Sequence, residues 1–255
     1  MNPSVLAEKL LTARIRREKV ELAPQERPTN WDEARQTAAL CLRDQPYGWK
    51  LGATNQAGRD TFGLTRPIYG GLDAHEIYEA GKDVIVPSLP APLAEPEIVV
   101  RLGDSVAPID TPRSDEEILA LIDGVCAAVE FPSTCLLSPE TEGVLSFVAD
   151  RAGVGFLALG EFAPAETLQT LGNANTQLIL DGMTVAEGNS NLLIGGVFGA
   201  LRGFFVETGK EGRALHPNDV ISTGGLCEAL PLGQAASVGA VIEGLPEAHF
   251  RLSYA

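Results

Sequence analysis

Cysteine and histidine are scarce in this sequence, and their spacing fits no common metal or disulfide pattern. The four cysteines form no C-x-x-C pair, and the three histidines form no H-x-x-x-H pattern. We therefore expect reduced cysteines in the core and histidines at surface or hydrogen-bonded positions, without a zinc site or a disulfide framework. The G-x-S-x-G, P-loop and dinucleotide-binding motifs are missing too, so the sequence does not support a serine hydrolase or a nucleotide-binding enzyme.

Positive charge is also in short supply. Lys and Arg total 19 against 34 Asp and Glu, which gives a formal net charge of -15 at pH 7. Such a surface repels the phosphates of nucleic acids and anionic membranes, so we expect neither as a partner. No hydrophobic run approaches the roughly 18 residues of a membrane span, and the chain begins with a charged amphipathic stretch, so we expect a cytoplasmic protein.

The hydrophobic content of 45% is enough for a sizeable core. Apolar residues recur at helical spacing over residues 4–21, and Asn30 can cap a second helix over residues 31–42. Two later helices are expected, one capped by Ser114 with Glu117 three residues on, and one over residues 197–208.

Short apolar runs rich in β-branched residues follow residue 72 and predict strands over residues 84–86, 98–102, 154–159 and 176–180. Asp181-Gly182 lies between two such runs and predicts a hairpin, because a type I′ turn needs positive φ at both central positions. The fold class is therefore α+β, weighted towards β. A boundary near residue 75 would divide an N-terminal helical segment, residues 1–75, from a β-rich domain that carries the site, residues 76–255.

Three glutamates have the spacing of a candidate metal site. Strand periodicity places Glu95 and Glu97 on one face, about 7 Å apart along the backbone, so both carboxylates can reach one cation. Glu130 ends an apolar run and carries a carboxylate into an apolar layer, where it needs a partner. The alternatives are a solvated strand end for the first two and a buried Arg or Lys partner for the third. Three carboxylates together would favour Mg²⁺ or Mn²⁺ over Zn²⁺.

Two other segments are candidates for a ligand-binding role. Lys50 lies between an aromatic residue and glycines, in a segment too apolar for an ordinary charged surface, so we expect a lysine with a lowered pKa. The alternative is a surface lysine whose stem lies along the protein. Residues 220–225 predict a strand that runs into a glycine turn, whose hydroxyl and N–H groups can hold a carboxylate, although such a segment is often only a turn.

Six segments, taken in order, resemble the motifs of the fumarylacetoacetate hydrolase superfamily, and in particular its 2-keto-4-pentenoate hydratase and 4-oxalocrotonate decarboxylase group. The resemblance covers nearly the whole chain. The segments are Gly48-Trp49-Lys50-Leu51-Gly52-Ala53-Thr54, Pro67-Ile68-Tyr69-Gly70, Glu95-Pro96-Glu97-Ile98, Ala128-Val129-Glu130, Val148-Ala149-Asp150 and Ser222-Thr223-Gly224-Gly225.

The resemblance implies a mixed β-sandwich roll with flanking helices and a small N-terminal helical segment, assembled as a homo-oligomer. It implies that Glu95, Glu97 and Glu130 hold Mg²⁺ or Mn²⁺, which chelates the 1-carboxylate and 2-oxo oxygen of a small 2-oxo acid substrate. It also implies that Lys50 is catalytic.

The same resemblance implies substrate contacts from Asp150, Thr223 and Gly224. Three positions depart from the family pattern. Ile68 stands where these enzymes usually carry an Asp that would pair with Lys50, and the segment after Glu130 lacks the Asp-Ser-Arg stretch that the family often shows. Arg151 follows Asp150 where the family often has Asn.

The reaction that the resemblance favours is hydration of a 2-hydroxy-2,4-dienoate in the degradation of aromatic compounds. The alternatives are decarboxylation of a 2-oxo diacid, C–C bond hydrolysis of an acylpyruvate, keto–enol isomerisation, and a non-catalytic relative that binds a 2-oxo acid. Hydrolysis would need a positioned base, for which His75 and Glu76 are the candidates.

Overall fold

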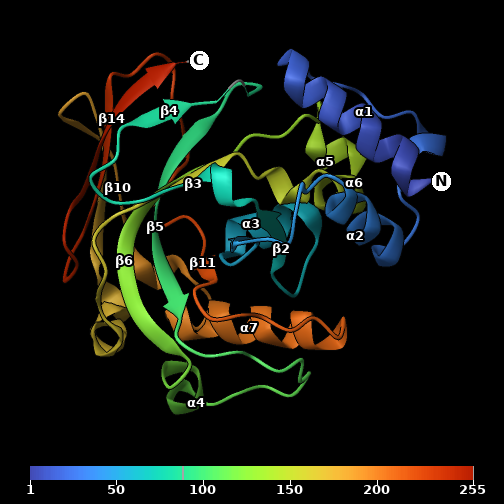
Figure 1. The fold of residues 1–255 in the computed structure, drawn as a ribbon. Helices are drawn as coiled ribbons and strands as arrows, with labels where there is room; N and C mark the ends of the chain where they lie inside the picture. The colour runs from blue at the N-terminus through green and yellow to red at the C-terminus, as the bar shows by residue number, and fades with distance from the viewer. Residues whose placement is uncertain (88, 255) are drawn as a thin grey trace.

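A nine-stranded mixed β-sheet forms the centre of the computed structural model, which describes residues 1–87 and 89–254 (Figure 1). Seven strands follow the order β2-β1-β11-β5-β6-β7-β3, while β12 pairs with β5 and β8 pairs with β6. The strands of this sheet are β1 (Gly48–Gly52), β2 (Ile68–Leu72), β3 (Ile77–Tyr78), β5 (Leu93–Leu102), β6 (Ile122–Phe131), β7 (Phe156–Leu159), β8 (Ala163–Pro164), β11 (Val220–Ser222) and β12 (Leu230–Pro231).

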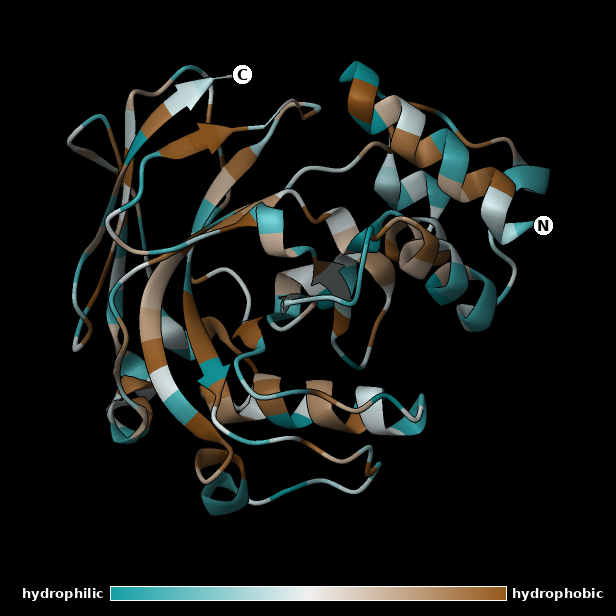
Figure 2. Ribbon diagram, in the orientation of Figure 1, coloured by the Kyte–Doolittle hydropathy of each residue, from teal (hydrophilic) through white to brown (hydrophobic). Residues whose placement is uncertain are grey.

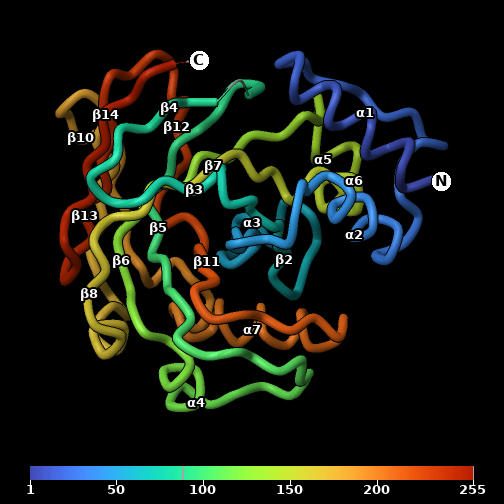
Figure 3. Tube along the Cα trace, in the orientation of Figure 1, coloured from blue at the N-terminus to red at the C-terminus, as the bar shows by residue number. Residues whose placement is uncertain are grey.

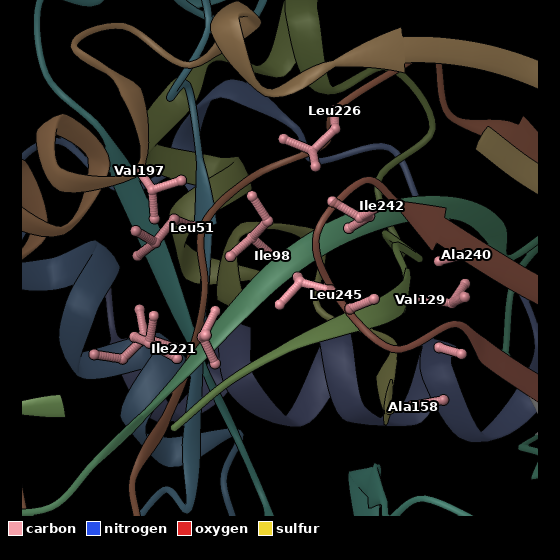
Figure 4. Packing of buried hydrophobic residues seen from close by; sticks show 14 of the residues in the cluster. Leu51, Ile98, Val129, Ala158, Val197, Ile221, Leu226, Ala240, Ile242 and Leu245 are labelled. Atoms are coloured by element: carbon pink, nitrogen blue, oxygen red, sulfur yellow. The ribbon is translucent and has the colours of Figure 1, made fainter. Parts of the chain in front are cut away.

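A second, five-stranded sheet packs against β5 and β6 through β13. Its order is β10-β9-β13-β14-β4, and its strands are β4 (Val84–Val86), β9 (Asn175–Leu180), β10 (Met183–Asn189), β13 (Ser237–Ile242) and β14 (Ala248–Tyr254). The main hydrophobic core lies between the two sheets, where Figure 4 shows the side chains of Ile98, Val129, Ala240 and Ile242 gathered together. The long apolar runs of β5 and β6 are also evident in Figure 2.

Helices cover the remaining surfaces of the large sheet. Helix α1 packs on α2, and α2 packs on α6, so that the N-terminal helices and the helices after β6 form one group with its own buried cluster (Figure 3). The α-helices are α1 (Pro3–Arg16), α2 (Trp31–Leu40), α3 (Gln56–Phe62), α4 (Asp115–Leu119), α5 (Pro139–Glu142), α6 (Val144–Ala149) and α7 (Gly196–Lys210). The 3₁₀ helices are η1 (Pro24–Glu26), η2 (Ala74–Glu76), η3 (Arg151–Gly153), η4 (Ala165–Asn173) and η5 (Ser190–Leu192).

The large sheet is rolled, so that its two ends approach each other. Strands β2 and β3 stand at opposite ends of the strand order, yet Ile77 at the start of β3 packs against the buried cluster that contains Leu72 at the end of β2. That cluster also contains Val99 of β5 and Ala128 of β6. Because side chains alternate across a strand, Glu97 faces the same interior as Val99. The inner face of the roll is therefore apolar around Val99 and Ala128 and carries the ionisable side chain of Glu97 beside them.

Most of the local predictions are confirmed. Strands β9 and β10 form the predicted hairpin, with φ of 50° at Asp181 and 78° at Gly182. The side chain of Asn30 accepts a hydrogen bond from the N–H of Glu33 at the start of α2. The capping box of Ser114 begins α4 as predicted. The α+β roll with flanking helices is likewise the fold that the structure shows.

Several element boundaries differ from the predictions. Helix α1 ends at Arg16 instead of residue 21, because Arg17 adopts a left-handed conformation with φ of 59° and closes the helix. Helix α2 ends at Leu40, two residues early, whereas α7 continues through Gly209 to Lys210. The division near residue 75 stays a prediction, although β1 and β2 precede it and are strands of the large sheet. No helix in the described part of the chain is long and apolar enough to cross a membrane.

The stacked rings of Phe131 and Phe156 lie in the core, and a substitution there tests how much this packing contributes to stability. Their centroids are 4.0 Å apart with an interplanar angle of 9°, and both side chains are fully buried. We expect Phe156→Ala to lower the free energy of unfolding by about 3–5 kcal/mol, because it removes buried apolar surface and leaves a cavity. Urea denaturation followed by circular dichroism measures the change. Leu137→Ala, at an exposed leucine, is the control and should change stability by less than about 0.5 kcal/mol. A similar loss in both variants would contradict this assignment of the core.

Candidate metal centre

The pairing of β5 with β6 brings three glutamates together. Glu95 lies directly opposite Glu130 in this antiparallel pair, and Glu97 is the next residue on the same face of β5. One carboxylate oxygen from each glutamate can be chosen so that all three lie within 4.8 Å of one another. Glu97 and Glu130 are completely buried, whereas Glu95 is half-buried. The carboxylate oxygens of Glu97 and Glu130 are therefore out of contact with bulk water.

Three of the buried oxygens have no hydrogen-bond partner. They are Oε1 of Glu97 and both carboxylate oxygens of Glu130. A buried carboxylate oxygen that accepts no hydrogen bond costs roughly several kcal/mol. Such atoms therefore mark a place where a further ligand is needed. The donors are all hard oxygens, which suits Mg²⁺ or Mn²⁺. The residues present therefore fit a divalent cation.

The electrostatics of the three carboxylates point the same way. Burial, followed by the charge of Glu95, raises the pKa of Glu97 to about 8. Burial also raises the pKa of Glu130 well above its usual range, in spite of the opposing effect of Lys50. Both groups therefore tend to hold protons near neutral pH unless a cation takes their place.

The segment after β11 fixes the orientation of Glu97. The Ser222 hydroxyl donates a short hydrogen bond to Oε2 of Glu97, and the N–H of Gly224 donates to the same oxygen at 2.7 Å. Gly224 has φ of 111°, and a Cβ at this position would lie 1.9 Å from Oγ1 of Thr54, so only glycine fits. With Oε2 held in this way, Oε1 is the oxygen that remains for a ligand.

Lys50 is the cation of this centre. It lies on β1, paired with Gly70 of β2 on one side and Ser222 of β11 on the other. Only 6% of the residue is exposed, and Nζ lies 3.6 Å from Oε2 of Glu130. The sequence analysis gave a buried Arg or Lys as one possible partner of Glu130, and Lys50 is such a partner. A single ammonium cannot balance three carboxylates, however, which leaves room for a further positive charge.

The predicted lowering of the Lys50 pKa is wrong. Burial does oppose the charged form, but attraction to Glu130, Glu95 and Glu97 outweighs burial and raises the pKa of Lys50. The sequence segment showed the apolar surroundings of the lysine and not the acidic strands that pack beside it. The neighbouring carboxylates therefore favour the charged form of Lys50.

The polar groups of the three predicted substrate-binding residues are engaged within the chain. The Thr223 hydroxyl donates to the carbonyl of Ile98 at 2.8 Å, and the Gly224 N–H is used on Glu97. Asp150 accepts hydrogen bonds at one oxygen from the Thr134 hydroxyl at 2.7 Å and the Cys135 N–H at 2.6 Å. Arg14 contacts its other oxygen at 3.3 Å. Contact of these residues with a substrate stays a prediction, while their contacts within the chain position Glu97 and the segment after β6.

Glu76 does not present a free carboxylate. Both of its oxygens accept hydrogen bonds from the Arg151 guanidinium at 2.7 Å. Asp73, His75 and Glu76 form a second acidic group, but Asp73 accepts hydrogen bonds from the N–H groups of Arg43 and Asp44. The carboxylates of this group are thus already partnered within the chain.

Comparison with known proteins identifies the family of this chain. The model for the C-terminal domain of fumarylacetoacetate hydrolase matches residues 57–251. A 4-oxalocrotonate decarboxylase from Pseudomonas sp. is 26% identical over 203 residues, which cover 80% of this chain and 77% of the relative.

Two solved structures share the fold. The 4-oxalocrotonate decarboxylase from Pseudomonas putida G7, complexed with magnesium and adipate, superposes with a TM-score of 0.85 at 20% identity and covers 98% of this chain and 97% of its own. Fumarylpyruvate hydrolase from Pseudomonas aeruginosa, in complex with Mn²⁺ and pyruvate, gives a TM-score of 0.58 at 15% identity, with 81% of this chain and 89% of its own covered. On the extent of the family match, this chain belongs to the fumarylacetoacetate hydrolase family.

Proposed function

We propose that this chain is a divalent-metal-dependent decarboxylase of a small 2-oxo diacid that carries a carbon–carbon double bond. The proposal rests on the convergence of Glu95, Glu97 and Glu130, where three buried oxygens accept no hydrogen bond and the one nearby ammonium is that of Lys50. Glu95, Glu97 and Glu130 are the proposed metal ligands, and Lys50 is the proposed catalytic residue. The solved relatives support this assignment, because they are complexed with magnesium or Mn²⁺ and with small organic acids.

A cation bound at this centre supplies a Lewis acid that stabilises negative charge on the 2-oxo oxygen of the substrate. The protein residues hold and shield that charge. Ser222 and Gly224 fix the carboxylate of Glu97, so that this carboxylate need not reorient to bind the cation. The complete burial of Glu97 and Glu130 keeps water away and strengthens every electrostatic interaction there. Lys50 keeps a proton beside the centre, where it can offset developing negative charge or return a proton to the product.

The titratable groups of the centre favour decarboxylation over hydration or hydrolysis. Water addition and hydrolysis both need a group that takes a proton from water. The proposed ligands are committed to the cation and Lys50 is cationic, while burial and Glu95 raise the pKa of the nearby Cys227 thiol to about 11. None of these groups is a free base near neutral pH.

Loss of carbon dioxide from such a substrate needs no base. In 2-oxohex-3-enedioate the terminal carboxylate is attached to a carbon that adjoins the double bond conjugated with the 2-oxo group. The bond that breaks is the one between C5 and the carbon of the terminal carboxylate. Its electron pair moves along the conjugated chain to the 2-oxo oxygen, and carbon dioxide leaves. The product is the enolate of 2-hydroxypenta-2,4-dienoate, which one proton neutralises.

Hydration of a 2-hydroxy-2,4-dienoate remains the second candidate, because the same six sequence segments resemble hydratases and because that substrate offers the same pair of oxygens to a cation. Catalysis by a homo-oligomer, as the family resemblance implies, is part of either proposal.

The reaction is tested with the purified protein, Mn²⁺ and 2-oxohex-3-enedioate. We expect carbon dioxide and the dienol chromophore to form together, and a chelator to stop both, because the reaction depends on the cation. Carbon dioxide release and ultraviolet absorbance are the measurements. In a parallel experiment 2-hydroxypenta-2,4-dienoate is the substrate. Gain of one water there, without carbon dioxide release from the diacid, would replace the decarboxylase with a hydratase, and inertness towards both compounds with Mn²⁺ bound would leave a binding protein.

The metal ligands are tested by calorimetric titration of Mn²⁺ into chelator-treated protein. We expect Glu97→Gln to abolish measurable binding, because it removes a ligand and a charge while keeping the shape of the side chain. Ser222→Ala should weaken binding by about 10–100-fold, because the hydroxyl orients Glu97.

Ser190→Ala is the matched control, since Ser190 is also fully buried but its hydroxyl donates to the carbonyl of Leu171. Its Mn²⁺ affinity should equal that of the wild-type protein. Unchanged affinity in Glu97→Gln would overturn the assignment of the site.

A further inference from the structure

A buried turn of unusual backbone conformation lies beside the candidate centre. Arg151, Ala152 and Gly153 have φ of 51°, 52° and 73°, so three successive residues adopt the left-handed conformation. Arg151 and Ala152 carry side chains, and each pays about 1 kcal/mol or more for this conformation. All three residues are buried. Such a conformation persists only where the surrounding structure holds it, and residues of this kind cluster at functional sites.

An ion pair between Arg151 and Glu76 holds the turn. The guanidinium donates two parallel hydrogen bonds to the carboxylate, each of 2.7 Å, and a third to the carbonyl of Gly71 at 3.3 Å. The side chain of Arg151 is 3% exposed and that of Glu76 is 11% exposed. A bidentate pair in this environment fixes direction as well as distance. We refer to Arg151 and Glu76, with the turn at residues 151–153, as the latch.

The latch is packed directly against the strand that pairs with the Lys50 strand. A Cβ added at Gly70 would lie 1.8 Å from the carbonyl oxygen of Arg151, so this carbonyl occupies the space where a side chain of β2 would otherwise stand. Gly70 is the cross-strand partner of Lys50, and cross-strand partners project to the same face of a sheet. The turn also contacts β1 itself. The carbonyl of Arg151 therefore lies on the side of the sheet to which Lys50 projects.

Strand β2 offers Lys50 no acidic side chain of its own, since its residues are Ile68, Tyr69, Gly70, Gly71 and Leu72. We propose that the latch positions Lys50, with Arg151 and Glu76 acting through Gly70 to hold the ammonium against Glu130. Arg151 and Glu76 are positioning residues in this account and not catalytic ones. The inference rests on the proposed role of Lys50 in the reaction, but its effect on the lysine is measurable without turnover.

The test compares the wild-type protein with the double variant Arg151→Met/Glu76→Gln, which removes both charges at once and so leaves no uncompensated buried ion. Brief acetylation followed by mass spectrometry reports how accessible each lysine is. We expect Lys50 to be acetylated about tenfold faster in the double variant, because its side chain leaves Glu130 more often. Exposed Lys82 should react equally fast in both proteins.

Three controls separate positioning from general loss of structure. The Cys126 thiol is completely buried inside the roll and should stay unreactive in the double variant. The variant Arg101→Met/Asp123→Asn removes a different arginine–carboxylate ion pair, with a contact of 2.8 Å, and should leave Lys50 protected. The Arg151→Lys variant keeps the charge but loses the paired hydrogen bonds. In this variant Lys50 should be acetylated at an intermediate rate.

Kinetics and cation binding complete the experiment. The double variant should lose roughly 10–100-fold in kcat, as expected for a displaced catalytic group, with KM and Mn²⁺ affinity unchanged. Unchanged Lys50 labelling, or equal exposure of Lys50 and Cys126, would overturn the proposal. Increased Lys50 labelling in a protein without decarboxylase activity would uphold the latch while refuting the proposed reaction.

Discussion

Three neighbouring carboxylates on β5 and β6 repel one another, and the surrounding groups are arranged around this repulsion. Glu95, Glu97 and Glu130 can place one oxygen each within 4.8 Å of the others, and two of them are completely buried. Like charges this close in a medium of low dielectric repel strongly, and the single ammonium of Lys50 does not neutralise them. A divalent cation would offset this charge and coordinate the buried oxygens that accept no hydrogen bond. Without one, burial would force protons onto Glu97 and Glu130.

The rolled sheet is suited to hold such a centre because every contributing group lies on or directly beside a strand. Strands β5 and β6 supply the three carboxylates, β11 and its extension supply Ser222 and Gly224, and β1 supplies Lys50. Groups held on a hydrogen-bonded sheet keep their positions better than groups on loops. The second sheet and α7 bury the opposite face of these strands, so the site is supported by the main core (Figure 4).

Local sequence patterns predicted much of the fold and the acidic part of the site. The Asp181-Gly182 turn, the caps at Asn30 and Ser114 and the shared strand face of Glu95 and Glu97 all follow from rules that span a few residues. Features that depend on distant pairing were not visible. Ser222 meets Glu97 across 125 residues of chain, and the acidic neighbours of Lys50 reversed the expected direction of its pKa shift. The left-handed conformation of Arg151 is likewise imposed by tertiary contacts, because nothing in a local Asp-Arg-Ala-Gly sequence requires it.

We propose that one divalent cation is held between the three glutamates. Crystals of the protein grown with Mn²⁺ and measured near the manganese absorption edge test it most directly. We expect one strong anomalous peak within bonding distance of an oxygen from each of Glu95, Glu97 and Glu130, next to Lys50. A peak at another group of side chains, such as Asp73, His75 and Glu76, or none at all in crystals saturated with Mn²⁺, would contradict it.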